Sequence, residues 1–235
     1  MQRPLTGLIL TALLLAGCAG RVPGPQDSGL YHSPARAYSL ALDSSVFRGA
    51  VTLTEQCDMK GGTLNIWDGT NRFFRIDYLK IGEHALADVP SFASERTVTE
   101  QVLNNYLRVI LPQVDTLKRS EVLLSEFVET GRGDAMFSVV NIELKEDKIP
   151  DGVTGKSFYY GILVFTRGDF VYVVQHRVDS YQPDKLKQLL SGLRQDMLVP
   201  GVLRGNTTVN PAQATEDMKA KGGIDQSSIV ARCGG

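Results

Sequence analysis

The stretch Phe158–Val178, FYYGILVFTRGDFVYVVQHRV, is the most β-prone part of this 235-residue chain. Two runs rich in aromatic and β-branched residues, Phe158–Thr166 and Phe170–Val178, flank the triplet Arg167-Gly168-Asp169, which is typical of a tight turn. Side chains on both faces of these runs are apolar, as in strands that are covered on both sides. The stretch therefore predicts a central hairpin of a sheet that helices cover.

Other segments alternate apolar and polar residues with the period of a half-buried strand. In one of them the apolar residues at 74, 76 and 78 point one way, and Arg75 and Asp77 point the other way. We expect four strands of an antiparallel meander, followed by a hairpin that precedes the central one. These expected strands are Tyr38–Asp43, Val51–Thr54, Leu64–Ile66 and Phe73–Leu79, then Glu121–Thr130 and Asp134–Leu144.

Two segments have the pattern of amphipathic helices. Thr97 and Glu100 have the spacing of a capping box, which predicts that a helix begins at Thr97 and ends or kinks at Pro112. Pro183 is suited to the first turn of a second helix. That helix carries an apolar stripe: Leu186, Leu189, Leu190, Leu193 and Met197. The expected fold class is α+β, an antiparallel sheet packed by an internal and a C-terminal amphipathic helix.

This order of elements, together with the stretch from Gly161 to Val174, resembles the PsbP-like fold over roughly residues 36–199. That fold is shared by a thylakoid-lumen photosystem subunit, a Ran-binding nuclear import factor and many bacterial lipoproteins. The resemblance implies a domain that acts through protein surfaces. Because one fold hosts many functions, it transfers no functional residue to this chain.

The N-terminal segment has the layout of a secretory signal. Arg3 precedes an uncharged apolar run, Leu5–Gly17, which is too short to span a bilayer. The run ends in Leu15-Ala16-Gly17-Cys18, which resembles the lipobox of bacterial lipoproteins. The resemblance implies cleavage before Cys18, followed by attachment of lipid to its sulfur and its amine. Several acyl chains on one residue anchor a protein stably at a membrane.

These features divide the chain into four parts. We expect a signal peptide over residues 1–17, a lipidated N-terminus and flexible tether over 18–35, one domain over 36–199, and an irregular polar tail over 200–235. Ala19 follows the cysteine, and the absence of Asp there resembles outer-membrane sorting. The expected location is the cell envelope, with the domain on the periplasmic side of the outer membrane.

Lipid on Cys18 leaves two further cysteines, Cys57 and Cys233. An exported compartment is oxidising, which favours a disulfide between them. Two free thiols and a bridge between two chains remain alternatives.

The net charge is −1, and no single-sign field is expected. This composition argues against nucleic acid as a partner and indicates no anionic membrane surface beyond the lipid anchor. The expected partners are the membrane, through Cys18, and another envelope protein; no cofactor is indicated, and no small-molecule ligand is identified.

Few residues suggest a chemical site, and no catalytic or metal motif is present. Trp67 is out of phase with its apolar neighbours, which makes it the first candidate for contact with a partner. Glu83, His84 and Asp88 lack the ligand spacing of a metal site, which favours an exposed loop. His32 lies in the expected tether, and His176 is explained as a polar strand end and not as a general base. The triplets Arg132-Gly133-Asp134 and Arg167-Gly168-Asp169 are explained as turns.

We therefore expect a membrane-anchored envelope lipoprotein of a non-catalytic, protein-interaction or assembly type. One alternative is a periplasmic carrier of an apolar or lipid ligand, held between the sheet and the helices. A second is a hydrolase that uses the loop carboxylates Glu83, Asp88, Glu146 and Asp147. Scattered acidic residues usually form a solvated surface, which disfavours that alternative.

The anchor is tested by the intact mass of the natively expressed protein. The mature chain should begin at Cys18 and carry acyl chains, and it should partition into detergent. A Cys18→Ser variant should lack the acyl mass and stay in the aqueous phase. The same spectrum without reductant reports whether Cys57 and Cys233 are paired. A native product that keeps its leader, or that carries no acyl chain, contradicts the prediction.

Overall fold

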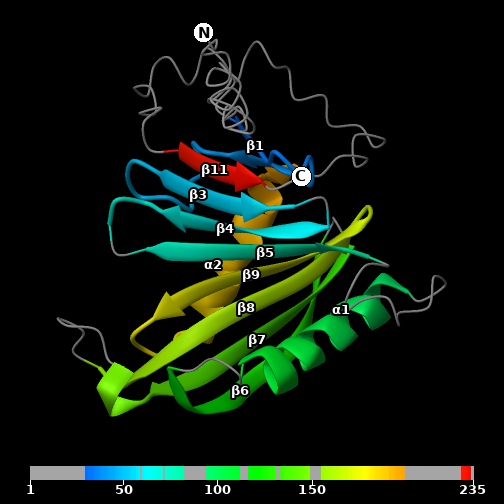
Figure 1. The fold of residues 1–235 in the computed structure, drawn as a ribbon. Helices are drawn as coiled ribbons and strands as arrows, with labels where there is room; N and C mark the ends of the chain where they lie inside the picture. The colour runs from blue at the N-terminus through cyan, green and yellow to red at the C-terminus, as the bar shows by residue number, and fades with distance from the viewer. Residues whose placement is uncertain are drawn as a thin grey trace, which may run out of the picture.

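A computed structural model describes residues 30–58, 60–70, 72–81, 94–111, 116–130, 133–148, 155–198 and 229–233. In these residues an eight-stranded sheet and a three-stranded sheet are packed with two helices (Figure 1). The helices are α1 (Glu95–Asn105), which continues into a π-helical turn (Tyr106–Ile110), and α2 (Pro183–Asp196). A short 3-10 turn spans Glu146–Lys148. The strands are β1 (Leu30–His32), β2 (Ser39–Ala41), β3 (Thr52–Cys57), β4 (Gly61–Trp67), β5 (Phe73–Lys80), β6 (Leu117–Thr130), β7 (Gly133–Leu144), β8 (Ser157–Arg167), β9 (Phe170–Val178), β10 (Met197–Leu198) and β11 (Ile229–Cys233).

The large sheet has the strand order β11-β3-β4-β5-β9-β8-β7-β6. All neighbouring strands are antiparallel except β11 and β3, which run parallel. The small sheet has the order β1-β2-β10. A large antiparallel sheet with two helices confirms the α+β class that the sequence predicts. None of the described helices has the length and apolar character that a membrane-spanning helix requires.

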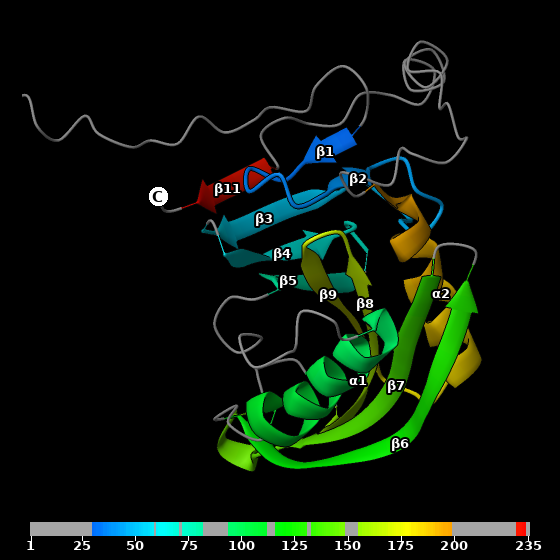
Figure 2. The ribbon, with the colours of Figure 1, turned by 90° about the vertical axis from the view of Figure 1, so that its right-hand side faces the viewer.

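The helices lie on opposite faces of the large sheet (Figures 1 and 2). α1 packs on β7 and β8, and α2 packs on β8 and β9 from the other side. Each helix encloses its own cluster of apolar side chains, so residues 161–166 of β8 and 171–176 of β9 are buried on both faces. The two strands of the predicted central hairpin, β8 and β9, are therefore neighbours whose central residues are buried on both faces.

Gly161 brings α2 close to β8. A Cβ atom at this position would lie 3.1 Å from Leu186 Cδ2 and 3.1 Å from Leu190 Cδ1. The missing side chain therefore lets the leucine stripe of α2 rest directly on the strand. The burial of Leu186, Leu190, Leu193 and Met197 follows from this close approach.

The start of α1 differs from the prediction by two residues. Ser94 is the N-cap, and its side chain accepts a hydrogen bond from the backbone N–H of Thr97 at 3.2 Å. Thr97 therefore belongs to the first turn and does not cap the helix. Serine and threonine both suit a cap, so the local sequence alone does not separate the two positions.

Three further expectations about the strands differ from the structure. β1 lies within the expected tether, and β11 lies within the expected irregular tail. β2 belongs to the small sheet and not to the meander, which consists of β3, β4 and β5. All three differences come from pairing between segments far apart in the chain, which a local pattern does not reveal.

A buried carboxylate joins the N-terminal segment to the large sheet. Glu55 on β3 is fully buried and accepts hydrogen bonds from the hydroxyl groups of Tyr31, Ser33 (2.7 Å) and Tyr78 (2.5 Å). Burial and the nearby Glu55 charge raise the pKa of Tyr31 and of Tyr78, so both hydroxyls keep their protons and donate. Residues from β1, β3 and β5 are thereby held at one point.

Replacing this acceptor should destabilise the protein. Glu55→Ala leaves three buried hydroxyl groups without their acceptor and opens a cavity, and we expect a loss of about 2–5 kcal/mol in the free energy of unfolding. Glu55→Gln keeps one oxygen and the shape of the side chain, so its loss should be smaller. Chemical denaturation measures both, with Glu100→Ala on the exposed face of α1 as the control. Equal stability of Glu55→Ala and the native protein is the result that would refute this role.

Candidate functional site on the open face of the sheet

The α1 side of β4 and β5 carries polar and aromatic side chains. Three cross-strand pairs alternate along it: Thr63 with Asp77, Asn65 with Arg75, and Trp67 with Phe73. None of these side chains is fully buried, in contrast to the residues on the α2 side of the same strands. We call the surface formed by these three pairs, together with Gln175 on β9 and Tyr106, the open face.

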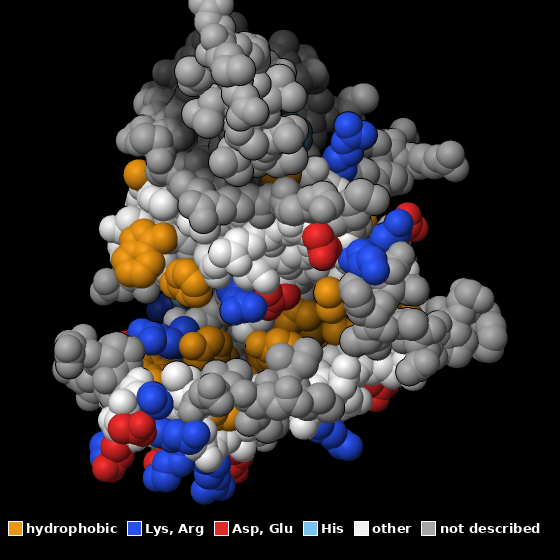
Figure 3. All heavy atoms as spheres, viewed as in Figure 1, with side chains coloured by type: hydrophobic (Ala, Val, Ile, Leu, Met, Phe, Trp, Pro, Cys, Tyr) orange, Lys and Arg blue, Asp and Glu red, His pale blue; other side chains and the backbone are white. Residues whose placement is uncertain are grey.

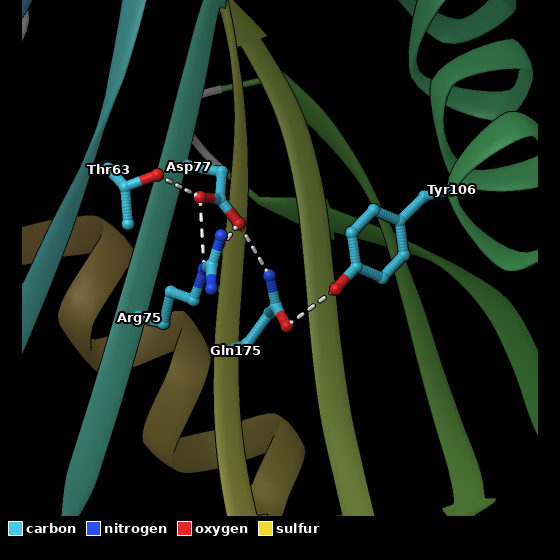
Figure 4. Close-up of polar contacts among 5 residues, drawn as sticks. All are labelled: Thr63, Arg75, Asp77, Tyr106 and Gln175. Carbon is cyan, nitrogen blue, oxygen red and sulfur yellow. Dashed lines mark hydrogen bonds and ion pairs between the residues drawn. The ribbon is translucent and has the colours of Figure 1, made fainter. Parts of the chain in front are cut away.

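A hydrogen-bonded network crosses the open face from β4 to the helix (Figure 4). Asp77 is its centre and accepts from Thr63 Oγ1 at 2.6 Å and from Gln175 Nε2 at 2.8 Å. Arg75 Nε lies 3.0 Å and 2.9 Å from the two Asp77 oxygens. Tyr106 donates to Gln175 Oε1 at 2.8 Å. The network therefore fixes side chains from three strands and from the turn that follows α1.

Arg75 and Tyr106 both keep their protons near neutral pH. Burial lowers the pKa of Arg75, but the hydrogen bond and charge of Asp77 outweigh this and raise it overall. Burial, followed by the Asp77 charge, raises the pKa of Tyr106 to about 12. A charged guanidinium and neutral hydroxyl groups at fixed positions suit the recognition of a polar partner group.

Trp67 and Phe73 form an exposed aromatic pair at one end of the open face. Trp67 is 49% exposed and Phe73 is 41% exposed. On the surface shown in Figure 3, hydrophobic side chains lie beside basic and acidic ones. The phase of Trp67 in the sequence is compatible with a position facing solvent or a helix, and the structure places it partly in solvent. An exposed aromatic pair next to fixed polar groups is typical of a contact surface for another protein.

The cysteines of the expected disulfide lie on neighbouring strands. Cys57 at the end of β3 is directly opposite Cys233 at the end of β11 in the parallel register. Cys57 is disulfide-bonded. Cys18 lies outside the described residues.

The histidines and loop acids are not brought together. His84, Glu83 and Asp88 lie outside the described residues. Glu146 and Asp147 are exposed on the turn Glu146–Lys148, where Lys156 Nζ is 2.5 Å from Glu146 and Lys148 Nζ is 3.6 Å from Asp147. His32 Nδ1 is 2.6 Å from Ser39 Oγ. Among the described residues, no group of three or more His, Cys, Asp or Glu side chains is placed to hold a metal ion.

The turn triplets have the backbone that the turn interpretation requires. Gly133 is the first residue of β7 and has a φ of 96°, and Gly168, between β8 and β9, has a φ of 56°. Both values lie in the left-handed region that glycine tolerates. Arg132 lies outside the described residues.

Sequence reasoning did not identify the network or Glu55 as a site. The alternation in β5 places Arg75 and Asp77 on one side, but Gln175 and Tyr106 join them only through the β5–β9 register and the position of α1. Glu55 has a local signal, because it is in phase with the buried Leu53 on β3. A carboxylate in the buried phase of a strand is therefore a usable warning of a polar cluster in the core.

Comparisons with known proteins give only structural similarity. No protein-family model matches the chain, and no curated protein is similar to it in sequence. Similar solved structures include cyanobacterial PsbP (CyanoP) from Synechocystis sp. PCC 6803, with 11% identity and a TM-score of 0.42, covering 79% of this chain and 98% of that chain. The Saccharomyces cerevisiae Ran-binding protein Mog1p has 13% identity and a TM-score of 0.36, covering 58% of this chain and 78% of that one.

A third similar structure, from Bacteroides thetaiotaomicron VPI-5482, has 11% identity and a TM-score of 0.44. It covers 83% of this chain and 59% of that chain. The PsbP and Ran-binding structures are of the two kinds that the sequence resemblance names. At these TM-scores the similarity carries no argument about function.

His176 should make stability depend on pH. It is buried, stacks on Phe74 with ring centroids 4.5 Å apart, and has Nδ1 2.8 Å from the Phe73 carbonyl oxygen. Burial lowers its pKa, with the charges of Arg72 and Arg177 acting in the same direction. Below pH of about 6.5 the unfolded chain gains a proton here that the folded chain does not accept, so stability falls as the pH falls.

The free energy of unfolding, measured by denaturation from pH 8 to pH 5, checks this dependence. His176→Phe removes the titrating group, so its stability should decrease less than that of the native protein between pH 7 and pH 5. Between pH 8 and pH 7 the two proteins should have the same slope. An unchanged slope in the lower range would exclude His176 as the source.

Proposed function

We propose that this chain is a membrane-anchored envelope lipoprotein that binds another envelope protein through its open face. The anchor is lipid on Cys18, and the location is the periplasmic side of the outer membrane. The domain is of the PsbP-like type. The observation that carries the binding role is the exposed Trp67–Phe73 pair beside the fixed Arg75–Asp77 network.

The geometry of the open face suits a protein partner. Trp67 and Phe73 offer a large apolar contact area, and aromatic and arginine side chains are the residue types that dominate binding energy at protein interfaces. The ion pair with Asp77 holds the Arg75 guanidinium in place, which reduces the entropy lost when a partner binds. The side chain of Arg75 is still 50% exposed, so its outer N–H groups remain accessible.

A non-catalytic role agrees with the chemistry of this face. The raised pKa of Tyr106 and the charged state of Arg75 make both groups donors and not bases. The alternative of an apolar-ligand carrier requires space between β8 and the helices. At Gly161 that space is occupied by Leu186 and Leu190 of α2.

We also propose Cys233 as the disulfide partner of Cys57. Residues opposite each other on neighbouring strands have Cα atoms about 4.8 Å apart, which is within the range that a disulfide spans. The bridge would fasten β11, the last described strand, to β3.

The aromatic pair is tested by co-purification from cross-linked cells. A Trp67→Ala/Phe73→Ala variant should recover its partner at least tenfold less well than the native protein, because central aromatic residues each contribute about 2 kcal/mol or more to binding. The fold should be kept, since neither side chain belongs to the buried core.

Tyr181→Ala is the matched control for this test. Tyr181 is also an aromatic residue and is 47% exposed, but its ring contacts Tyr159, which packs with the core on the α2 side. This variant should retain native recovery. If the native protein recovers no partner, or if the double variant recovers it equally well, the proposed role of the open face is wrong.

A further inference from the structure

In the part of the chain that the structure describes, one edge of the large sheet is a long strand with a single neighbour. β6 has 14 residues and pairs with β7 on one side, and it is the last strand in the described sheet. Figures 1 and 2 show it at the opposite end of the sheet from β11. An edge strand of this kind presents backbone N–H and C=O groups that can pair with another strand.

Charge is distributed unevenly along β6. Lys118 and Arg119 lie near its start, and Glu126 and Glu129 lie near its end. Two copies of such a strand attract each other when they run antiparallel, because the basic start of one lies beside the acidic end of the other. Parallel copies would place like charges side by side, which is unfavourable.

The middle of β6 is irregular and apolar. The register with β7 shifts between Val122 and Leu124, so Leu123 is an additional residue without a partner on β7. Val122 is 47% exposed and Leu123 is 40% exposed. A bulge normally disfavours indiscriminate pairing at an edge. Here it also places two exposed apolar side chains at the centre of the charged pattern.

The bulge restricts the registers in which two copies can pair. Arg119 pairs with Glu143 of β7, and Glu126 pairs with Phe137. Glu143 and Phe137 lie on the same face of β7, so Arg119 and Glu126 lie on the same face of β6. The bulge between them allows an odd-numbered and an even-numbered residue to share that face. Ser120 and Ser125 lie opposite Ile142 and Ser138 and share the other face. Residues paired across two antiparallel strands must point to the same face of the sheet. The pairs Arg119–Glu126 and Ser120–Ser125 both meet this condition.

We propose that β6 pairs antiparallel with β6 of a second copy of this chain, with Val122 opposite Leu123 and Arg119 opposite Glu126. The two-fold axis then passes between the apolar residues, and each dimer contains two Arg119–Glu126 contacts. Ser120 lies opposite Ser125 in the same register. A shift by two residues in one direction places Glu121 opposite Glu126, which brings two acidic side chains together, and a shift by two in the other direction leaves Arg119 opposite Leu124, without its acidic partner. The pairing does not depend on the lipid anchor or on the open face.

The test is the self-association of the full chain, purified in mild detergent and measured by sedimentation velocity. The native protein should form dimers. Arg119→Glu and Glu126→Arg should each raise the dimer dissociation constant by roughly tenfold or more, because each change places like charges at both contacts. Lys185→Glu changes the net charge as Arg119→Glu does, but Lys185 is an exposed residue of α2 outside the proposed contact, so this variant should retain native dimerisation.

Mixing the two single variants separates a specific contact from general repulsion. In a mixed dimer of the Arg119→Glu and Glu126→Arg chains, both contacts again join opposite charges, so dimers should return. Glu126 also accepts from Lys187 Nζ at 2.8 Å within one chain, and thermal unfolding of each variant verifies that the fold is kept. A monomeric native protein, unaffected single variants, or a mixture that stays monomeric would each overturn the proposal.

The register has its own readout in the same detergent-purified protein. Ser120→Cys chains mixed with Ser125→Cys chains should form a disulfide between chains upon mild oxidation. Ser125→Cys mixed with Lys185→Cys, an exposed position on α2, should not. Equal cross-linking of the two mixtures would contradict the register.

Discussion

The close contact between α2 and β8 at Gly161 is the constraint on which the arrangement of the molecule depends. Because no Cβ atom separates them, the leucine stripe of α2 rests on the strand, and α1 covers the opposite face of the same strand. A helix is about 10 Å wide and strands lie about 4.8 Å apart, so one helix covers about two strands. The eight-stranded sheet is roughly 34 Å wide, and the two described helices, both packed on β8, cover only part of it.

The composition of the uncovered strands follows from this geometry. On the α2 side, β3, β4 and β5 bury Leu53, Ile66 and Ile76 within the core that includes Tyr31 and Leu40 of the small sheet. Among the described residues, no such layer covers their α1 side, and the side chains there include the polar Thr63, Asn65, Arg75 and Asp77, which tolerate water. Trp67 and Phe73 do not fit this rule, since they expose apolar surface where polar residues would be more soluble. Their exposure is therefore the feature of this face that stability does not explain, which favours a role in binding.

Local patterns predicted the elements well where burial is symmetrical or strongly periodic. The strands β8 and β9, with apolar residues on both faces, and the leucine stripe of α2 can be recognised in the sequence, because the pattern of burial is constant along each of these segments. The short strands β1 and β11 have no such pattern, and they exist only because β2 and β3 offer them an edge. The network around Asp77 is likewise a product of register: residues 63, 77, 175 and 106 meet through three pairings that no single segment encodes. The position of Glu55 in the buried phase of β3 can be seen in the sequence. Its hydroxyl partners cannot be predicted in the same way, because they come from two other strands and from the chain between β1 and β2.

The two ends of the described chain converge on one edge of the sheet. Glu55 on β3 holds Tyr31 of β1, and β3 also pairs with β11, so the first and last strands are both attached to the same strand. A force on an N-terminal anchor would therefore act on the sheet at this edge, through the buried Glu55 carboxylate and its three hydroxyl donors. This contact resists displacement, because the loss of any one hydroxyl donor would leave the buried Glu55 side chain with an unsatisfied hydrogen-bond acceptor. The opposite edge, β6, and the open face carry no part of that attachment, which leaves both available for contacts with other chains.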